Sequence, residues 1–152
     1  MKSYQYTECG LNNVLIENVD VATDDKGQQV YRIQNINGLH KAIALGIVQH
    51  QNSISGEELR FLRTEMGLTQ AELAAYIHKE HLTVGRWERG EVSPIDSNAE
   101  AIIRLLAIEK LDLGKDMPME ALTKMCVPTA QTQFVKIDGS DSNDYRLLKA
   151  AS

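Results

Sequence analysis

Side chains that could act as nucleophiles, acids or bases occur along the whole chain, but not in the arrangements that catalysis requires. Serine, histidine, aspartate and cysteine are all present. None of them stands in a Gly-x-Ser-x-Gly elbow, a phosphate-binding loop or a carboxylate pair with matching helix or strand context. The sequence therefore predicts that the protein is not an enzyme.

The two cysteines suggest neither a metal nor a disulfide. Cys9 and Cys126 lie far apart, and neither belongs to a CxxC pair. Cys9 with His40 or His50 would supply too few ligands for a structural zinc ion, which needs four. We therefore expect no metal site and no cofactor.

Length and composition indicate a folded protein. The chain has 152 residues, of which 43% are hydrophobic and 24% are charged, ordinary values for a globular protein. No run approaches the 18 apolar residues of a membrane span, and the first residues do not read as a signal peptide. We expect a cytoplasmic protein without a membrane partner.

Residues 55–111 carry the strongest local signals, which are those of successive helices. Three pairs have capping-box spacing: Ser55 with Glu58, Thr69 with Glu72, and Ser97 with Glu100. Gly67 and Gly90 are suitable helix ends. The last helix repeats apolar residues at core-facing positions, namely Ala99, Ile102, Ile103, Leu106 and Ala107. Four short helices around one core are predicted.

The N-terminal residues predict a β-hairpin followed by one helix. Residues 13–19 and 29–35 are rich in Val and Ile, and residues 25–27 between them supply a turn. Residues 39–50 then place Leu39, Ile43 and Ile47 at helical spacing. Because a lone hairpin is only marginally stable, this unit should lean on the helical domain or on a second subunit.

The signals become weak after Leu113. Residues 117–122 could begin a helix, residues 132–137 alternate like a strand, and residues 138–144 look like a loop. We therefore divide the chain into an accessory unit (1–52), a helical domain (55–113) and a C-terminal extension (114–152) that is partly ordered or forms a dimer.

Residues 68–90, LTQAELAAYIHKEHLTVGRWERG, resemble the helix-turn-helix of phage repressors and of the XRE family of bacterial regulators. The resemblance covers about residues 56–111. Together with the hairpin and helix expected from the N-terminal residues, it implies a mainly α fold with a small α+β N-terminal unit. In this fold a four- to five-helix bundle with a helix-turn-helix follows a β-hairpin and one helix. The sequence departs from the family at His78, usually glycine, and at Glu80, usually a small polar capping residue.

The resemblance implies that the third helix of the domain lies in the major groove of DNA. Val84 and Trp87 should form its buried side. Arg86 is the expected base reader, because its planar guanidinium can bond guanine O6 and N7 together. The expected DNA-contacting residues are Thr69, Gln70, Lys79, His81, Leu82, Thr83, Gly85, Arg86 and Arg89.

Separate roles follow for several of these residues. Gln70 and the first amides of its helix should hold a phosphate, and Lys79 and Arg89 are further phosphate ligands. His81 would bond a base edge or a phosphate, Leu82 would pack on a thymine methyl, and Gly85 would let the backbone approach DNA. Alternatively, Arg89 belongs to a solvated helix end and His81 is an exposed histidine without a role.

The charge balance weakens electrostatic attraction to DNA. The chain has a net charge of −5, and residues 56–111 contain seven basic and ten acidic side chains. Binding should therefore depend on a few placed contacts that are doubled by dimerisation. We predict a homodimeric repressor or autoregulator that reads an inverted repeat in double-stranded operator DNA.

Two alternatives remain open. The layout is also similar to antitoxins of the MqsA kind, although their zinc-binding cysteine pairs are absent. The chain would then bind a toxin protein and repress its own operon. A protein-interaction module is the other alternative, since acidic charge weakens non-specific affinity for DNA.

Overall fold

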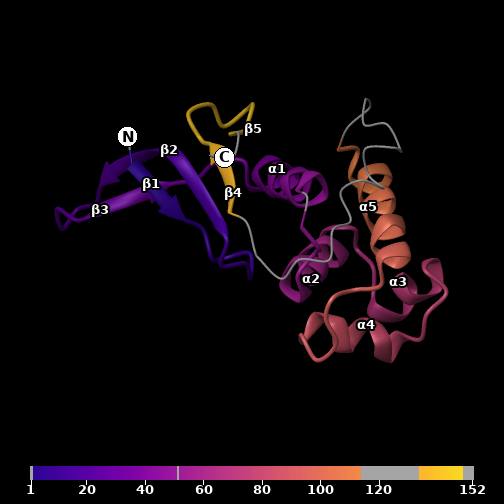
Figure 1. Cartoon of the computed structure of the whole chain (residues 1–152). Helices are drawn as coiled ribbons and strands as arrows, with labels where there is room; N and C mark the ends of the chain where they lie inside the picture. The colour runs from indigo at the N-terminus through magenta and orange to yellow at the C-terminus, as the bar shows by residue number, and fades with distance from the viewer. Residues whose placement is uncertain (1, 51, 114–133, 149–152) are drawn as a thin grey trace. The chain divides into compact units, whose positions relative to one another are not determined.

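The computed structural model describes residues 2–50, 52–113 and 134–148 of the chain, which is drawn in Figure 1. Two compact units are present, the first made of residues 1–46 and 134–152 and the second of residues 47–133. Among the described residues, helices dominate and the strands all belong to the first unit. The predicted fold class, mainly α with a small α+β N-terminal unit, is confirmed. The predicted three-part domain division stays a prediction.

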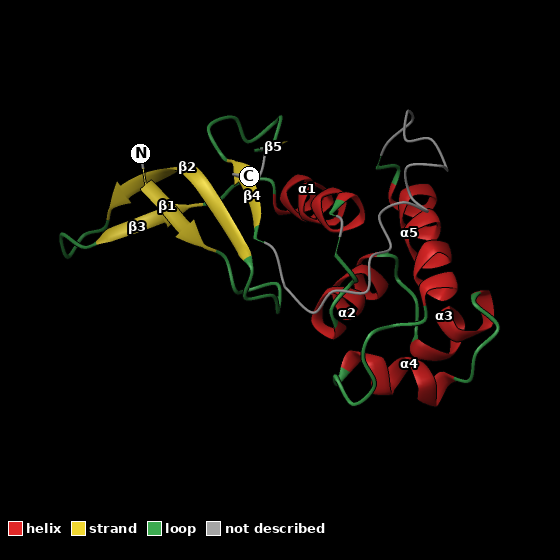
Figure 2. Cartoon of the chain, in the orientation of Figure 1, coloured by secondary structure: helices red, strands yellow, loops and turns green. Residues whose placement is uncertain are grey.

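The first unit contains a five-stranded sheet (Figure 2). Its strands are β1 (Lys2–Gln5), β2 (Val14–Thr23), β3 (Gln29–Arg32), β4 (Val135–Asp138) and β5 (Arg146–Leu147). Strands β2 and β3 pair antiparallel as a hairpin, as predicted, but residues 20–23 of β2 make the pairing rather than the predicted strand 13–19. The turn between them is fixed by the Asp24 carboxylate, which accepts the N–H groups of Lys26 and Gln28.

Three pairings in this sheet were not predicted, one of which joins β4 antiparallel to β5. Strand β1 pairs antiparallel with β2. Strand β4 pairs parallel with the first half of β2, with Val14 opposite Val135. The strand predicted at 132–137 is therefore confirmed from Val135 onward, while residues 132–133 and the helix predicted at 117–122 lie outside the described residues.

Helix α1 (Ile36–Gln49) begins before the predicted residue 39. It starts earlier because the Asn35 side-chain oxygen accepts the N–H of Gly38 at 3.2 Å and satisfies a donor of the first turn. The predicted apolar stripe is confirmed, since Leu39, Ile43 and Ile47 are fully buried.

The second unit contains the helices α2 (Gly56–Glu65), α3 (Gln70–Tyr76), α4 (His81–Glu88) and α5 (Ser97–Leu111). Two of the predicted capping boxes are present. Ser55 and Thr69 each accept a backbone N–H at 3.1 Å, from Glu58 and Glu72, and both glutamates bond back to the cap residue. The starts of α2 and α3 are therefore determined by local sequence.

Helix α5 corrects two predictions. Its N-cap is Asp96, which accepts the Ala99 N–H at 3.1 Å, rather than Ser97 paired with Glu100. Its buried face includes Ala99, Ile103 and Ala107, but Ile102 is 39% exposed. The buried face also includes Arg104, which the apolar pattern did not place there.

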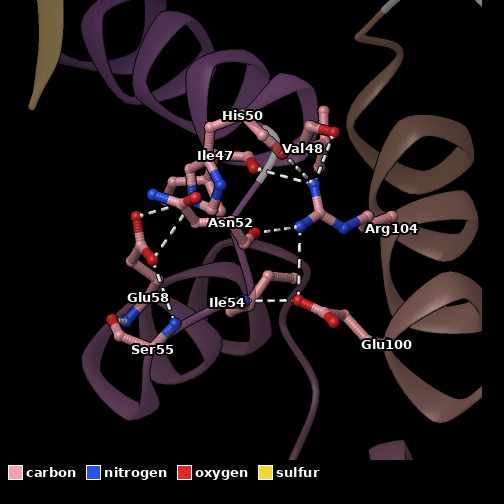
Figure 3. Close-up of polar contacts among 9 residues, drawn as sticks. All are labelled: Ile47, Val48, His50, Asn52, Ile54, Ser55, Glu58, Glu100 and Arg104. Atoms are coloured by element: carbon pink, nitrogen blue, oxygen red, sulfur yellow. Dashed lines mark hydrogen bonds and ion pairs between the residues drawn. The ribbon is translucent and has the colours of Figure 1, made fainter. Parts of the chain in front are cut away.

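The buried Arg104 side chain joins α5 to the end of α1 (Figure 3). Its Nη1 donates to the carbonyls of Ile47, Val48 and His50 at 2.8–3.2 Å, and its Nη2 donates to Asn52 O at 2.8 Å. Nη2 also lies 3.2 Å from the equally buried Glu100 carboxylate. Arg104 therefore satisfies carbonyls that the last turn of a helix leaves without intrahelical partners.

Candidate nucleic-acid interface

Helix α4 has one buried side and one exposed side. Val84 and Trp87 are 0% and 4% exposed, as predicted from their spacing. His81, Leu82 and Arg86 are exposed. The helix therefore presents an imidazole, an apolar side chain and a guanidinium to solvent, which are the groups that can contact base edges in a groove.

The turn between α3 and α4 shows why the family usually has glycine at the position of His78. His78 has a φ of +57°, a left-handed conformation that glycine adopts without steric cost and other residues rarely adopt. The chain closes the turn through the Lys79 N–H, which donates to Ala74 O at 2.9 Å. At the second departure, Glu80 is the N-cap of α4 but makes no side-chain capping bond.

The end of α4 is held by a buried cluster around Glu88. Arg63 of α2 donates to both Glu88 oxygens, from Nε at 2.6 Å and from Nη2 at 3.1 Å. Gln70 of α3 donates to Glu88 Oε1 at 3.1 Å. Side chains from three helices thus meet at one carboxylate, and this cluster sets the orientation of α4 relative to α2 and α3.

Arg63 was not predicted to belong to the site. It also donates from Nη1 to Leu68 O at 2.9 Å, between α2 and α3, so it binds both the loop and Glu88. A signal was present in the sequence, because Arg63 follows Leu59 by four residues and so shares its buried face. A charged residue at such a position indicates a buried partner.

The exposure of Gly85 differs from the prediction. We expected it on the solvent side of α4, but it is buried. A methyl group at Gly85 would meet Gln70 Oε1 at 3.2 Å and Arg89 Nη1 at 3.0 Å. The glycine therefore makes room for these two side chains to cross the helix, and its expected approach to DNA stays a prediction.

The remaining predicted residues occupy the rim of the exposed face. Thr69 and Lys79 are exposed, and Thr83 is half-buried. Arg89 is exposed and pairs with Glu91 at 2.9 Å. That hydrogen bond lowers the pKa of the Glu91 carboxyl, so Glu91 is ionised at neutral pH and partly offsets the positive charge of Arg89.

Gly56, the first residue of α2, is a second position that the sequence interpretation missed. A methyl group there would lie 2.4 Å from Trp87 O and 2.6 Å from Glu88 O. These backbone atoms cannot move without displacing α4. The N-terminus of α2 therefore approaches the end of α4 as closely as only glycine allows.

We expect Gly56→Ala to lower the free energy of unfolding by about 1–3 kcal/mol, the usual cost of overpacking a close contact. Urea unfolding followed by the fluorescence of Trp87, the single tryptophan of the chain, measures this loss. Gly67→Ala is an unsuitable control because Gly67 has a positive φ. Arg60→Ala, an exposed change on the same helix α2, serves better and should stay close to wild type. Unchanged stability in Gly56→Ala would contradict the close approach.

The described residues contain no group of three or more histidine, cysteine, aspartate or glutamate side chains that could hold a metal ion. Within the same residues, no helix has the length and apolar character needed to cross a membrane.

Comparison with known proteins points to the same segment. Residues 59–113 match the family described as helix-turn-helix. A putative HTH-type transcriptional regulatory protein of Aeropyrum pernix is 33% identical over 84 residues, which are 55% of this chain and 24% of that protein. The HTH-type transcriptional regulator DicA of Escherichia coli is 32% identical over 59 residues, 39% of this chain and 44% of its own. The chain thus spans less than half the length of either relative. No solved structure matches it.

Proposed function

We propose that the chain is a sequence-specific, DNA-binding transcription regulator of the XRE type, starting from the premise that residues 59–113 match the helix-turn-helix family. Helix α4 enters the major groove of the operator. The observation that carries the proposal is the division of α4 into a side fixed by Val84 and Trp87 and a side that exposes Arg86.

Arg86 is the base reader in this proposal. The major groove admits a helix, and guanine presents O6 and N7 to it as neighbouring acceptors. Arg86 is exposed near the C-terminal end of α4. His81 and Leu82 lie on the first turn of the same helix and contact neighbouring bases.

The phosphate contacts come from the rim of the same face. Thr69 and Gln70 stand at the start of α3, Lys79 lies in the turn, and Arg89 follows α4. Glu88 already binds the Gln70 amide group, so Gln70 reaches a phosphate from a fixed position. Such contacts orient the protein on the duplex without reading sequence.

We further propose a homodimeric repressor or autoregulator that binds an inverted repeat. Some of the basic side chains in the helical domain are engaged internally, since Arg63 and Arg104 pair with Glu88 and Glu100. Few cations then remain for phosphate. Two-fold symmetry doubles the contacts of each subunit and places the two copies of α4 on successive half-sites about one helical turn apart.

Selection of bound fragments from random DNA tests the proposal. The affinity for the selected consensus is then measured by fluorescence anisotropy at a fixed salt concentration. We expect a palindromic consensus and, for Arg86→Ala, a loss of about 10- to 100-fold in affinity per half-site, which corresponds to about 1–3 kcal/mol for a bidentate base contact. Specificity should relax at one base pair of each half-site.

The control is Arg60→Ala, which removes the same charge from an exposed position on α2 and should change affinity much less. Trp87 fluorescence verifies that both variants are folded. An Arg86→Ala protein that is folded and binds the consensus as well as wild type would overturn the base-reading role and favour a protein-binding module.

A further inference from the structure

Exposed apolar side chains of the first unit gather on one hollow surface. Val30, Tyr31 and Ile36 are 43%, 37% and 42% exposed, and all three line a groove of about 540 Å³. Clustered apolar exposure of this kind marks binding sites, and the volume is that of a small-molecule site. We call this surface the tyrosine groove and define it by Tyr4, Tyr6, Glu8, Val30, Tyr31 and Ile36.

Contacts with neighbouring residues hold the three tyrosine rings in place. Tyr4 of β1 and Tyr31 of β3 meet edge to face, with ring centroids 4.8 Å apart and planes at 84°. The Tyr6 hydroxyl lies 3.0 Å from His40 Nε2, and its ring packs edge to face with that imidazole. The groove is therefore lined by aromatic surfaces that are already oriented in the free protein.

The charge of the groove is negative. Among the described residues that line it, Glu8 is the one charged side chain. The Tyr4 hydroxyl donates to Glu8 Oε1 at 2.5 Å, and this hydrogen bond raises the pKa of Tyr4, so the phenol stays neutral at pH 7. Lys2 does not itself line the groove, but its ammonium donates at 2.5 Å to the Oε1 of Gln29, which does line it.

We propose that the tyrosine groove binds a small organic cation with an apolar or aromatic body, of the tertiary or quaternary amine class. Aromatic faces attract cations, most strongly where water is partly excluded, and the Glu8 carboxylate complements the positive charge. The apolar body would cover Val30 and Ile36. All these residues lie in the first unit, so the inference does not depend on DNA binding by the second.

Titration of the full-length protein with benzyltrimethylammonium, followed by NMR of backbone amides and methyl groups, tests the proposal. We expect saturable shifts at Val30, Tyr31 and Ile36. Phenylacetate, which joins a similar aromatic body to a negative charge, should bind at least about fivefold more weakly. Equal affinity for the two probes would overturn the proposal, as would the absence of saturable shifts in the groove.

Two variants locate the site. Glu8→Gln removes the charge but keeps an acceptor for the Tyr4 hydroxyl, and Tyr31→Leu removes an exposed aromatic face. Each variant should bind the cation about fivefold more weakly than wild type. Glu109→Gln, an exposed position on α5, removes the same charge from the second unit and should leave affinity unchanged. An equal loss in Glu109→Gln would identify non-specific attraction to an acidic protein and refute the site.

The oligomeric state provides a separate check. Sedimentation is compared for wild type and Tyr31→Leu, with thermal unfolding to verify that the variant is folded. We expect the same mass for both. If Tyr31→Leu instead dissociates a dimer, the groove is an interface between copies and the small-molecule proposal is wrong.

Discussion

Arg104→Ala is expected to lower the free energy of unfolding of the second unit by about 3–5 kcal/mol, the cost of breaking a buried ion pair from one side. Arg104 is 0% exposed and Glu100 is 1% exposed. Without the guanidinium, the Glu100 carboxylate stays buried without its counter-charge and keeps the hydrogen bond from the Ile54 N–H. The carbonyls of Ile47, Val48, His50 and Asn52 lose their donor as well.

Urea unfolding followed by Trp87 fluorescence measures this loss within the second unit. Arg104→Lys keeps the charge but has no planar fork for several carbonyls, so its stability should fall between wild type and Arg104→Ala. This variant keeps the prediction testable if Arg104→Ala does not fold. Lys110→Ala removes an exposed cation from the same helix and is the control. A midpoint for Arg104→Ala equal to that of Lys110→Ala would contradict the role of the buried network.

The buried charged residues of α5, Glu100 and Arg104, show what an apolar pattern cannot predict. The spacing of apolar residues placed Ile102 in the core and did not include Arg104, whereas Ile102 is 39% exposed and Arg104 is buried. An arginine can replace an apolar residue in a core only if carbonyls and a carboxylate surround it. Here the Glu100 carboxylate lies one helical turn before Arg104, but the carbonyls lie about fifty residues earlier in the chain. Local spacing could therefore indicate the ion pair but not the carbonyls that bury it.

The helix caps also show that a local pattern is reliable only where all its contacts are local. Ser55 and Thr69 cap their helices as predicted because every group of a capping box lies within four residues. The box predicted at Ser97 fails because its glutamate has other partners. Glu100 accepts the Ile54 N–H and pairs with Arg104, and Asp96 caps α5 in its place. A contact with a distant part of the chain thus engages the glutamate that the local spacing had assigned to the cap.

Non-local pairing explains what was missed in the sheet. Alternation predicted a strand that includes Val135, and turn residues predicted the hairpin of β2 and β3. Alternation does not indicate the partner of a strand, and Val135 pairs with Val14 from the opposite end of the sequence. The exposed side of α4 was predictable for the opposite reason, because Val84 and Trp87 are one helical turn apart.

Glu88→Ala is the second substitution with a large expected effect, a loss of about 3–5 kcal/mol in the free energy of unfolding. The Glu88 side chain is 5% exposed and that of Arg63 is 16% exposed. Removing the carboxylate leaves the Arg63 guanidinium largely buried without its counter-charge, and the Gln70 amide group loses its acceptor. Arg89 and Glu91 also form an arginine–glutamate pair, but both side chains are more than half exposed. Glu91→Ala should therefore lower the free energy of unfolding much less.

A double variant separates the stability of this cluster from its role in positioning. Arg63→Met with Glu88→Leu removes both charges together and fills a similar volume, and replacing a buried pair in this way is often neutral. We expect its urea midpoint, read from Trp87 fluorescence, to return close to that of wild type. Operator affinity should still be reduced, because Gln70 is no longer held beside Gly85 and the two contacts that fix the end of α4 are gone. Full recovery of both stability and operator affinity would show that the ion pair only fills space and does not orient the helix that reads DNA.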